Sequence, residues 1–96
     1  MLKVETIRSR LLPVFSSYNI KSAFLFGSYA KGLATEKSDI DLVVDSKLRG
    51  LNFFAFIEDV REALDEKEVD VFDVTHINEG SKVLQEVKAT GVKIYG

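Results

Sequence analysis

The sequence predicts a small α/β or α+β sandwich, in which a few helices pack on a sheet of short strands. Short apolar runs, typical of buried strands, alternate with longer stretches whose apolar residues recur at helical spacing. Glycines stand at several of the boundaries between them. The predicted order is helix, strand, helical turn, strand, helix, strand, helix and a short final strand.

Apolar spacing and terminal residues place each predicted element. Pro13 is expected to kink the first helix or to divide it into two pieces. A short helical turn is expected to open at Gly27 and to close at Gly32. Asn78 is a predicted N-cap of the last helix, and Gly91 is predicted to end it. The expected helices span residues 3–18, 51–64 and about 79–90, and the expected strands span residues 23–26, 39–44, 69–74 and 92–95.

Length and composition restrict the class of protein. We expect one domain over residues 1–96, because 96 residues leave no room for a second. The chain has no cysteine, which excludes disulfides and agrees with a cytoplasmic location. Its net charge of −2 argues against a strongly basic nucleic-acid surface, although a local basic patch stays possible. The longest apolar run, residues 53–57, is too short to cross a membrane, and no signal-peptide pattern opens the chain.

Gly27 and Ser28 join a predicted buried strand to a helical turn. Glycine permits a tight turn and close approach of a ligand to the backbone. Ser28 can cap the helix or donate its hydroxyl to a phosphate oxygen, and free N–H groups at a helix start attract anions. Taken alone, the pair is more typical of an ordinary turn with a serine cap.

Asp39 and Asp41 lie two residues apart on a predicted strand, so their side chains leave the same face. Ile40 and Leu42 then point to the opposite, buried face. Two neighbouring carboxylates repel each other, and a divalent cation with a preference for oxygen ligands, such as Mg²⁺, relieves that repulsion. Taken alone, the pair slightly favours a solvated strand edge.

Asp70 lies near the beginning of a third predicted strand and is a candidate third carboxylate. If this strand lies beside the Asp39–Asp41 strand, the three groups converge, as in two-metal sites for phosphoryl chemistry. Asp73 is a rival on the other face of the same strand. The local pattern gives only a weak preference for Asp70.

At these residues the chain resembles the minimal nucleotidyltransferases (MNT proteins) of the DNA polymerase β-like superfamily. Their signature is Gly-Ser, ten residues and Asp-x-Asp, with a further carboxylate on a later strand. Gly27-Ser28, residues 29–38 and Asp39-Ile40-Asp41 match it, and Asp70 follows in Val-Asp-Val. The extended pattern matches from residue 27 to residue 42, except that Lys31 stands where arginine is usual.

The resemblance implies a mixed sheet with helices packed on it, the core of the polymerase-β-like nucleotidyltransferases. It implies that Asp39, Asp41 and Asp70 are catalytic and bind Mg²⁺, with two ions expected. It also implies a nucleotide site in which Gly27 and Ser28 hold the β- and γ-phosphates of an NTP, with ATP expected. Lys31 and Ser38 complete the implied nucleotide-binding set.

The resemblance also implies a partner. Small MNT proteins are often antitoxins of HEPN-domain toxins, and some transfer AMP to a toxin tyrosine. We therefore expect a hetero-oligomer with a HEPN toxin, and neither a membrane nor direct nucleic-acid contact.

Two alternatives stay open at this stage. One is a catalytically silent module that neutralises the toxin by contact alone. The other is a nucleotidyltransferase for a small molecule such as an aminoglycoside, against which the short chain argues.

Two further residues allow either a functional or a purely structural interpretation. Phe54 is predicted to widen the core face of the second helix rather than to meet a partner. His76, the single histidine, is predicted to be a solvated loop residue.

Overall fold

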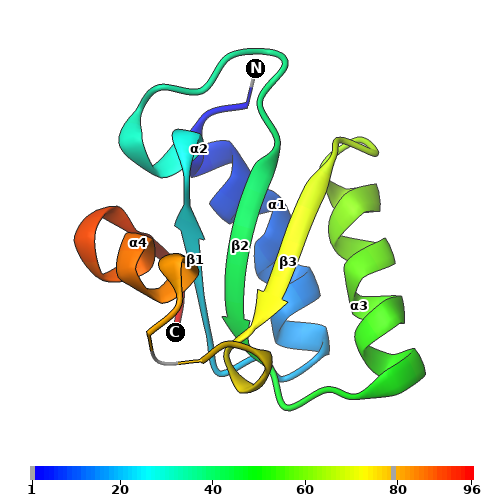
Figure 1. Cartoon of the computed structure of the whole chain (residues 1–96). Coiled ribbons are helices and arrows are strands. Elements are labelled where there is room, and N and C mark those ends of the chain that lie inside the picture. The colour runs from blue at the N-terminus through cyan, green and yellow to red at the C-terminus, as the bar shows by residue number, and fades with distance from the viewer. Residues whose placement is uncertain (1, 79) are drawn as a thin grey trace.

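The computed structural model describes residues 2–78 and 80–96, which form a four-stranded sheet with helices packed against it (Figure 1). This confirms the predicted mixed α/β architecture. The element order is α1 (Val4–Ser17), β1 (Ser22–Phe26), α2 (Ser28–Lys31), β2 (Ile40–Asp45), α3 (Gly50–Ala63), β3 (Val69–Asp73), the 3₁₀ turn η1 (Val74–His76), α4 (Lys82–Thr90) and β4 (Val92–Tyr95).

The sheet has the strand order β3-β2-β1-β4. β1 pairs antiparallel with both β2 and β4, whereas β2 and β3 are parallel. A parallel pair needs a long crossover, and the 14-residue helix α3 supplies it. The sheet is therefore mixed, and its two central strands are β2 and β1.

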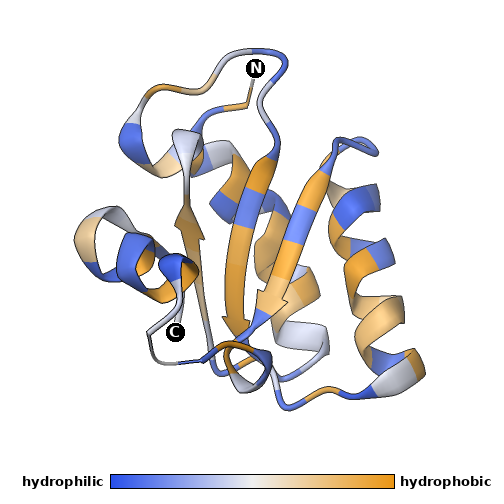
Figure 2. Ribbon diagram, viewed as in Figure 1, coloured by the Kyte–Doolittle hydropathy of each residue, from blue (hydrophilic) through white to orange (hydrophobic). Residues whose placement is uncertain are grey.

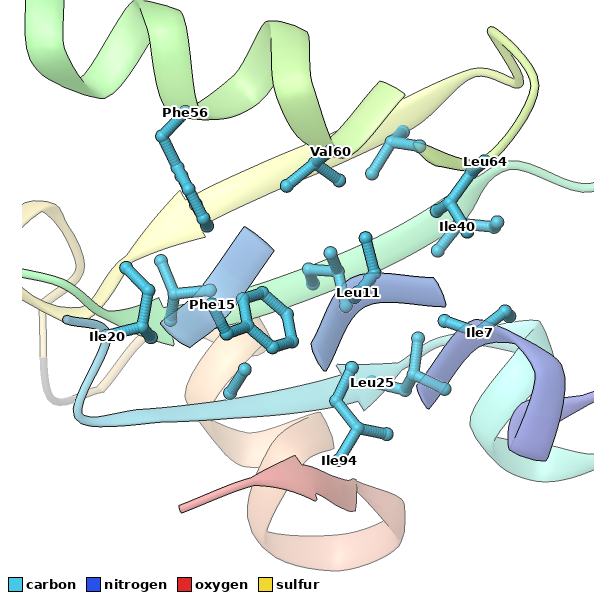
Figure 3. Close-up of a cluster of buried hydrophobic side chains, with 14 of the residues drawn as sticks. Ile7, Leu11, Phe15, Ile20, Leu25, Ile40, Phe56, Val60, Leu64 and Ile94 are labelled. Carbon is cyan, nitrogen blue, oxygen red and sulfur yellow. The ribbon is translucent and has the colours of Figure 1, made fainter. Parts of the chain in front are cut away.

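The hydrophobic core fills the space between one face of the sheet and helices α1 and α3 (Figure 3). Alternation along β2 sends Ile40, Leu42 and Val44 into this core, where all three are fully buried. The Phe15 and Phe56 rings approach to 6.1 Å between centroids and join the two helices. The other large core side chains are Ile7, Leu11, Leu25, Val60 and Leu64.

The structure excludes one of the two alternatives for Pro13 and moves the predicted start of the last helix. Pro13 lies inside α1 without dividing it, because its ring is on the exposed side of the helix and only one backbone bond is lost. Helix α4 begins later than predicted. Its N-cap is Ser81, whose hydroxyl accepts a hydrogen bond from the Leu84 N–H, rather than Asn78. Residue 79, the predicted first residue of this helix, lies outside the described residues.

The prediction for Phe54 was also wrong. Its side chain is 62% exposed, whereas Phe56 on the same helix is fully buried. A turn of 100° per residue separates the two directions by about 200°, so the stripe that faces the sheet includes Phe56 and leaves Phe54 on the outside. Within the described residues, no helix combines the length and the apolar composition needed to cross a membrane.

These two phenylalanines offer a matched test of the packing. Phe56→Ala should lower the free energy of unfolding by about 3–5 kcal/mol, because it leaves a cavity in the core. Phe54→Ala should change it by less than about 0.5 kcal/mol, since the side chain is exposed. Both substitutions make the same change in helix propensity, so urea denaturation of the two variants isolates the packing contribution. Equal losses in the two variants would contradict the assignment of the buried face.

Candidate active site

The turn between β1 and α2 brings backbone directly against a carboxylate. Gly27 has φ 73° and ψ −152°, a conformation that side chains disfavour. A Cβ atom added at Gly27 would collide with the Asp41 carboxylate. The positive φ favours glycine, and any larger residue would also displace the Asp41 carboxylate. Of the two roles left open for Ser28, the structure does not support capping, because Gly27 occupies the N-cap position and Ser28 is the first helical residue.

Asp41 and Asp70 are direct neighbours in the parallel pairing of β2 and β3. Paired residues of a parallel ladder send their side chains to the same face, and the strands lie about 4.8 Å apart. Figure 2 shows a hydrophilic band crossing both strands between hydrophobic segments. The two carboxylates therefore meet on the face opposite the core, with Asp41 half-buried and Asp70 exposed.

The surroundings of Asp41 oppose its ionisation. Burial, and then the negative charges of Asp70, Asp39 and Glu86, raise the pKa of the Asp41 carboxyl to about 6. A cation placed between the carboxylates would reverse this effect by favouring the charged form. The donors are hard carboxylate oxygens, which suit a divalent ion such as Mg²⁺.

Asp39 lies one residue before β2, rather than inside the strand as predicted, and its side chain is exposed. It is near enough to contribute to the raised pKa of Asp41. Across residues 2–78 and 80–96, no three His, Cys, Asp or Glu side chains stand in a ready-made arrangement for a metal ion. The binding of metal by Asp39, Asp41 and Asp70 stays a prediction.

Asp73 has a different environment from Asp70. It is 1% exposed and lies on the core side of β3, where it accepts hydrogen bonds from Ser46 and Thr75. Burial raises the pKa of this carboxyl, but the hydrogen bonds outweigh it and hold the pKa below its usual value. Asp73 therefore joins two loops, and Asp70 is the β3 carboxylate that faces Asp41.

The other predicted nucleotide-binding residues lie on α2 (Ser28, Lys31) and in the loop before β2 (Ser38). The Lys31 ammonium is 3.4 Å from a Glu86 carboxylate oxygen on α4, an exposed pair that adds little stability. The Ser38 hydroxyl accepts a hydrogen bond from the Thr35 N–H at 2.9 Å and braces the loop before β2. A nucleotide contact by Gly27, Ser28, Lys31 or Ser38 stays a prediction.

Sequence reasoning missed Glu86. It lies 45 positions after Asp41, in the middle of an amphipathic helix, and no local pattern distinguishes it from a solvated glutamate. In the structure it raises the pKa of Asp41 and pairs with Lys31. It is thus a fourth acidic group near the paired carboxylates, supplied by the packing of α4 beside β1.

Comparison with known families identifies the domain. Residues 9–96 match the family described as "Polymerase beta, Nucleotidyltransferase". The chain belongs to this family. The match includes the Gly27 turn, both neighbouring strands and their carboxylates, and it confirms the resemblance inferred from the sequence motif.

Two archaeal relatives share part of the sequence. MJ0435, a proposed protein adenylyltransferase of Methanocaldococcus jannaschii, is 34% identical over 44 residues, which are 46% of this chain and 47% of that protein. MJ1379, of the same organism and the same description, is 46% identical over 41 residues, or 43% of this chain and 41% of that protein. The aligned segment thus spans less than half the length of these curated relatives.

Solved structures resemble the chain over nearly its whole length. A chain of a toxin–antitoxin complex crystallised with AMP-PNP has a TM-score of 0.75 at 26% identity, covering 93% of this chain and 73% of that one. A chain of a variant MntA–HpeT toxin–antitoxin complex has a TM-score of 0.71 at 28% identity, covering 92% and 71%. A third chain comes from a complex of tri-AMPylated Shewanella oneidensis HEPN toxin with MNT antitoxin. Its TM-score is 0.70 at 23% identity, and the match covers 97% of this chain and 72% of that one, which shows the shared fold.

The raised pKa of Asp41 predicts how a neutral variant behaves. Between about pH 4 and pH 6 the folded state binds more protons than the unfolded state, so the Asp41 contribution to stability falls as pH rises. Asp41→Asn should therefore raise the free energy of unfolding at pH 7 in EDTA by about 1–2 kcal/mol, a value reduced from the full shift because solvent screens a half-exposed group. The gain should shrink towards pH 4.

Thermal melts with and without MgCl₂ complete this test. Mg²⁺ should raise the melting temperature of the wild-type protein and leave that of Asp41→Asn unchanged, because the variant lacks one of the paired carboxylates. A variant that is less stable than the wild type at pH 7 in EDTA would contradict the electrostatic account.

Proposed function

We propose that this chain is a Mg²⁺-dependent nucleotidyltransferase that moves AMP from ATP onto a tyrosine hydroxyl of a partner HEPN toxin, and so acts as an antitoxin. The observation that carries the proposal is the in-register pairing of Asp41 with Asp70 beside the Gly27–Ser28 turn. Family membership supports nucleotidyl transfer as the class of reaction. The likeness to chains of toxin–antitoxin complexes supports a toxin as the partner.

The carboxylates provide the part of the site that a bound cation would occupy. Asp41 and Asp70 would hold Mg²⁺ between β2 and β3, and Asp39 would join them from the loop before β2. Carboxylate oxygens are the ligands that Mg²⁺ prefers, and the raised pKa of Asp41 is that of a carboxyl crowded by negative charge. When bound, Mg²⁺ supplies positive charge that offsets the negative charge of the triphosphate, and two ions are expected.

The Gly27 turn would receive the triphosphate. Because Gly27 has no side chain and its backbone lies against Asp41, a phosphate can approach the main chain next to the carboxylates. Ser28 begins α2 and would donate its hydroxyl to a phosphate oxygen. Lys31 would contact phosphate as a point charge after its ammonium separates from the Glu86 carboxylate. Ser38 orders the loop that carries Asp39 through its hydrogen bond with Thr35.

Asp70 lies on the exposed side of the pair, where an acceptor can reach it. We assign it the positioning of the tyrosine hydroxyl for in-line attack on the α-phosphorus. The phenolic oxygen forms the new P–O bond, the bond between the α-phosphorus and its bridging oxygen breaks, and pyrophosphate leaves. The phenolic proton is released through Asp70 to solvent.

One observation favours a second function, neutralisation of the toxin by contact without transfer. Lys31 stands where the motif that the sequence resembles usually has arginine, and its ammonium lies 3.4 Å from a Glu86 carboxylate oxygen. A lysine cannot reproduce the bidentate contact of an arginine with phosphate. In this case the carboxylate variants would still neutralise the toxin.

Substitution of the carboxylates tests the proposed reaction. Asp39→Asn, Asp41→Asn and Asp70→Asn should each lower the rate of AMP transfer from α-labelled ATP to the purified HEPN partner by about 100-fold or more, because each removes a charge that acts on the triphosphate. Asp45→Asn is the matched control: it also lies on β2, four residues after Asp41, and should keep the rate within about twofold.

Binding of the partner, measured in parallel by calorimetry, separates the two functions. Loss of transfer with retained binding is expected of an active enzyme. Absence of transfer by the wild-type protein with any of the four NTPs, despite a bound partner, would overturn the enzymatic proposal and favour neutralisation by contact.

A further inference from the structure

A pocket and an apolar patch lie together at the end of the sheet opposite to the paired carboxylates. We propose that they form the docking surface for the partner protein, through a partner segment that carries both acidic and apolar side chains. This inference deepens the proposed function and rests on it for the identity of the partner. We call this surface the basic end; it consists of residues 47–51, Phe53, Phe54, Thr75 and His76.

The pocket is formed where two parallel strands end. Residues 46–49 follow β2 and η1 follows β3, so both segments leave the sheet at the same edge. In Figure 1 they lie together at the bottom of the view, whereas α2 lies near the top. In open α/β sheets, the crevice at the carboxyl ends of parallel strands is a common place for ligands. The pocket encloses about 710 Å³ and is lined by Lys47, Leu48, Arg49, Gly50, Phe53, Thr75 and His76.

The lining of this pocket is cationic although the chain as a whole has a net charge of −2. Lys47 and Arg49 contribute two permanent positive charges, and His76 adds an imidazole. Among the described residues that line the pocket, none carries an acidic side chain. The nearby carboxylate of Asp73 is turned away into the protein, where hydrogen bonds from Ser46 and Thr75 satisfy it. The pocket therefore favours a negatively charged occupant.

Asp73 also fixes the relative position of the two walls. Its Oδ2 accepts hydrogen bonds from the N–H and the hydroxyl of Ser46, at the start of one wall. Its Oδ1 accepts from the N–H and hydroxyl of Thr75 on the other wall, at 3.0 and 2.8 Å. A buried carboxylate with four donors holds these segments in one arrangement, and a preformed site binds a partner with less loss of entropy.

Large apolar side chains are exposed beside the pocket. Leu51 is 87% exposed and Phe54 is 62% exposed, and their spacing of three residues places them on one face of the first turn of α3. Phe53 lies between them in sequence and turns into the pocket, where its ring meets the His76 ring edge-on at 6.0 Å. Phenylalanine and arginine are enriched at protein interfaces, and the exposed Leu51 enlarges the apolar patch beside them.

This combination favours a protein over the other anionic occupants. A small phosphate ligand would use the cations but leave Leu51 and Phe54 in water. A nucleic-acid backbone would need a broader basic surface than two cations and one histidine. A protein segment with carboxylates beside apolar side chains meets both parts of the surface at once.

The position of the basic end leaves the paired carboxylates free for the acceptor. Asp41 is the second residue of β2, whereas Lys47 follows the end of that strand. About five residues of extended chain separate them, or roughly 15–20 Å at the usual rise per residue. A partner held at the basic end could therefore reach Asp70 with a tyrosine on a different part of its surface.

Calorimetric titration of the full chain with the purified HEPN partner tests the docking surface. Two variants change the basic end: the single substitution Arg49→Glu, and the double substitution Leu51→Ser with Phe54→Ser. Each should raise the dissociation constant for the partner by at least tenfold. Lys88→Glu and Leu12→Ser are matched controls, because they change an exposed lysine and a 53%-exposed leucine elsewhere on the surface, and should stay within twofold. Circular dichroism melts confirm that all four proteins fold.

Parallel measurements distinguish the other occupants. Each protein is titrated with a 20-nucleotide single-stranded RNA and with inorganic phosphate, and its mass in solution is determined by light scattering. Unchanged partner binding in both basic-end variants would overturn the proposal while leaving the proposed reaction intact. A second outcome would also overturn the docking proposal. In it, the basic-end variants lose RNA binding, phosphate binding or homodimer formation but bind the partner as tightly as the wild-type protein does. Failure of the wild-type protein to bind the partner would overturn both the partner assignment and this inference.

Discussion

The parallel, in-register pairing of β2 with β3 is the constraint on which both ends of this molecule depend. Ile40, Leu42 and Val44 are fully buried, so the side chain of Asp41 must leave the opposite face of β2. The register then places Asp70 beside it. A slip of one residue would turn Asp70 towards the core and leave Asp41 beside an apolar neighbour. Core packing by α1 and α3 therefore positions a polar site to which it contributes no side chain.

The same arrangement has an electrostatic cost. Asp39, Asp41, Asp70 and Glu86 gather on one side of the sheet, and burial of Asp41 adds to their mutual repulsion. Gly27 brings the main chain against the Asp41 carboxylate and leaves no room for a side chain between them. The hydrophobic core must offset this local instability, which a bound divalent cation would relieve. Active sites commonly combine perturbed pKa values with a loss of stability in this way.

Two aspartates three residues apart on β3 illustrate how one strand serves two purposes. Asp70 faces the exposed side with Asp41, whereas Asp73 is buried and joins the loops after β2 and β3 through Ser46 and Thr75. Hydrogen bonds keep Asp73 ionised in spite of its burial, and its pKa is accordingly lowered while that of Asp41 is raised. The acidic residues of β3 thus order one end of the sheet and supply chemistry at the other.

The sequence by itself determined the order of the elements, the nucleotidyltransferase motif and the buried side of β2, because these follow from local periodicity and from the ten-residue spacing between Ser28 and Asp39. It also indicated the Gly27 turn and the fourth strand. Only the tertiary structure decided that Asp70 rather than Asp73 faces Asp41, since that depends on the register between strands 29 residues apart. Tertiary packing also brought Glu86 to Lys31, left Phe54 exposed and assembled the basic end from the loop after β2, the start of α3 and η1. Contacts between distant segments set these features, and no local pattern records them.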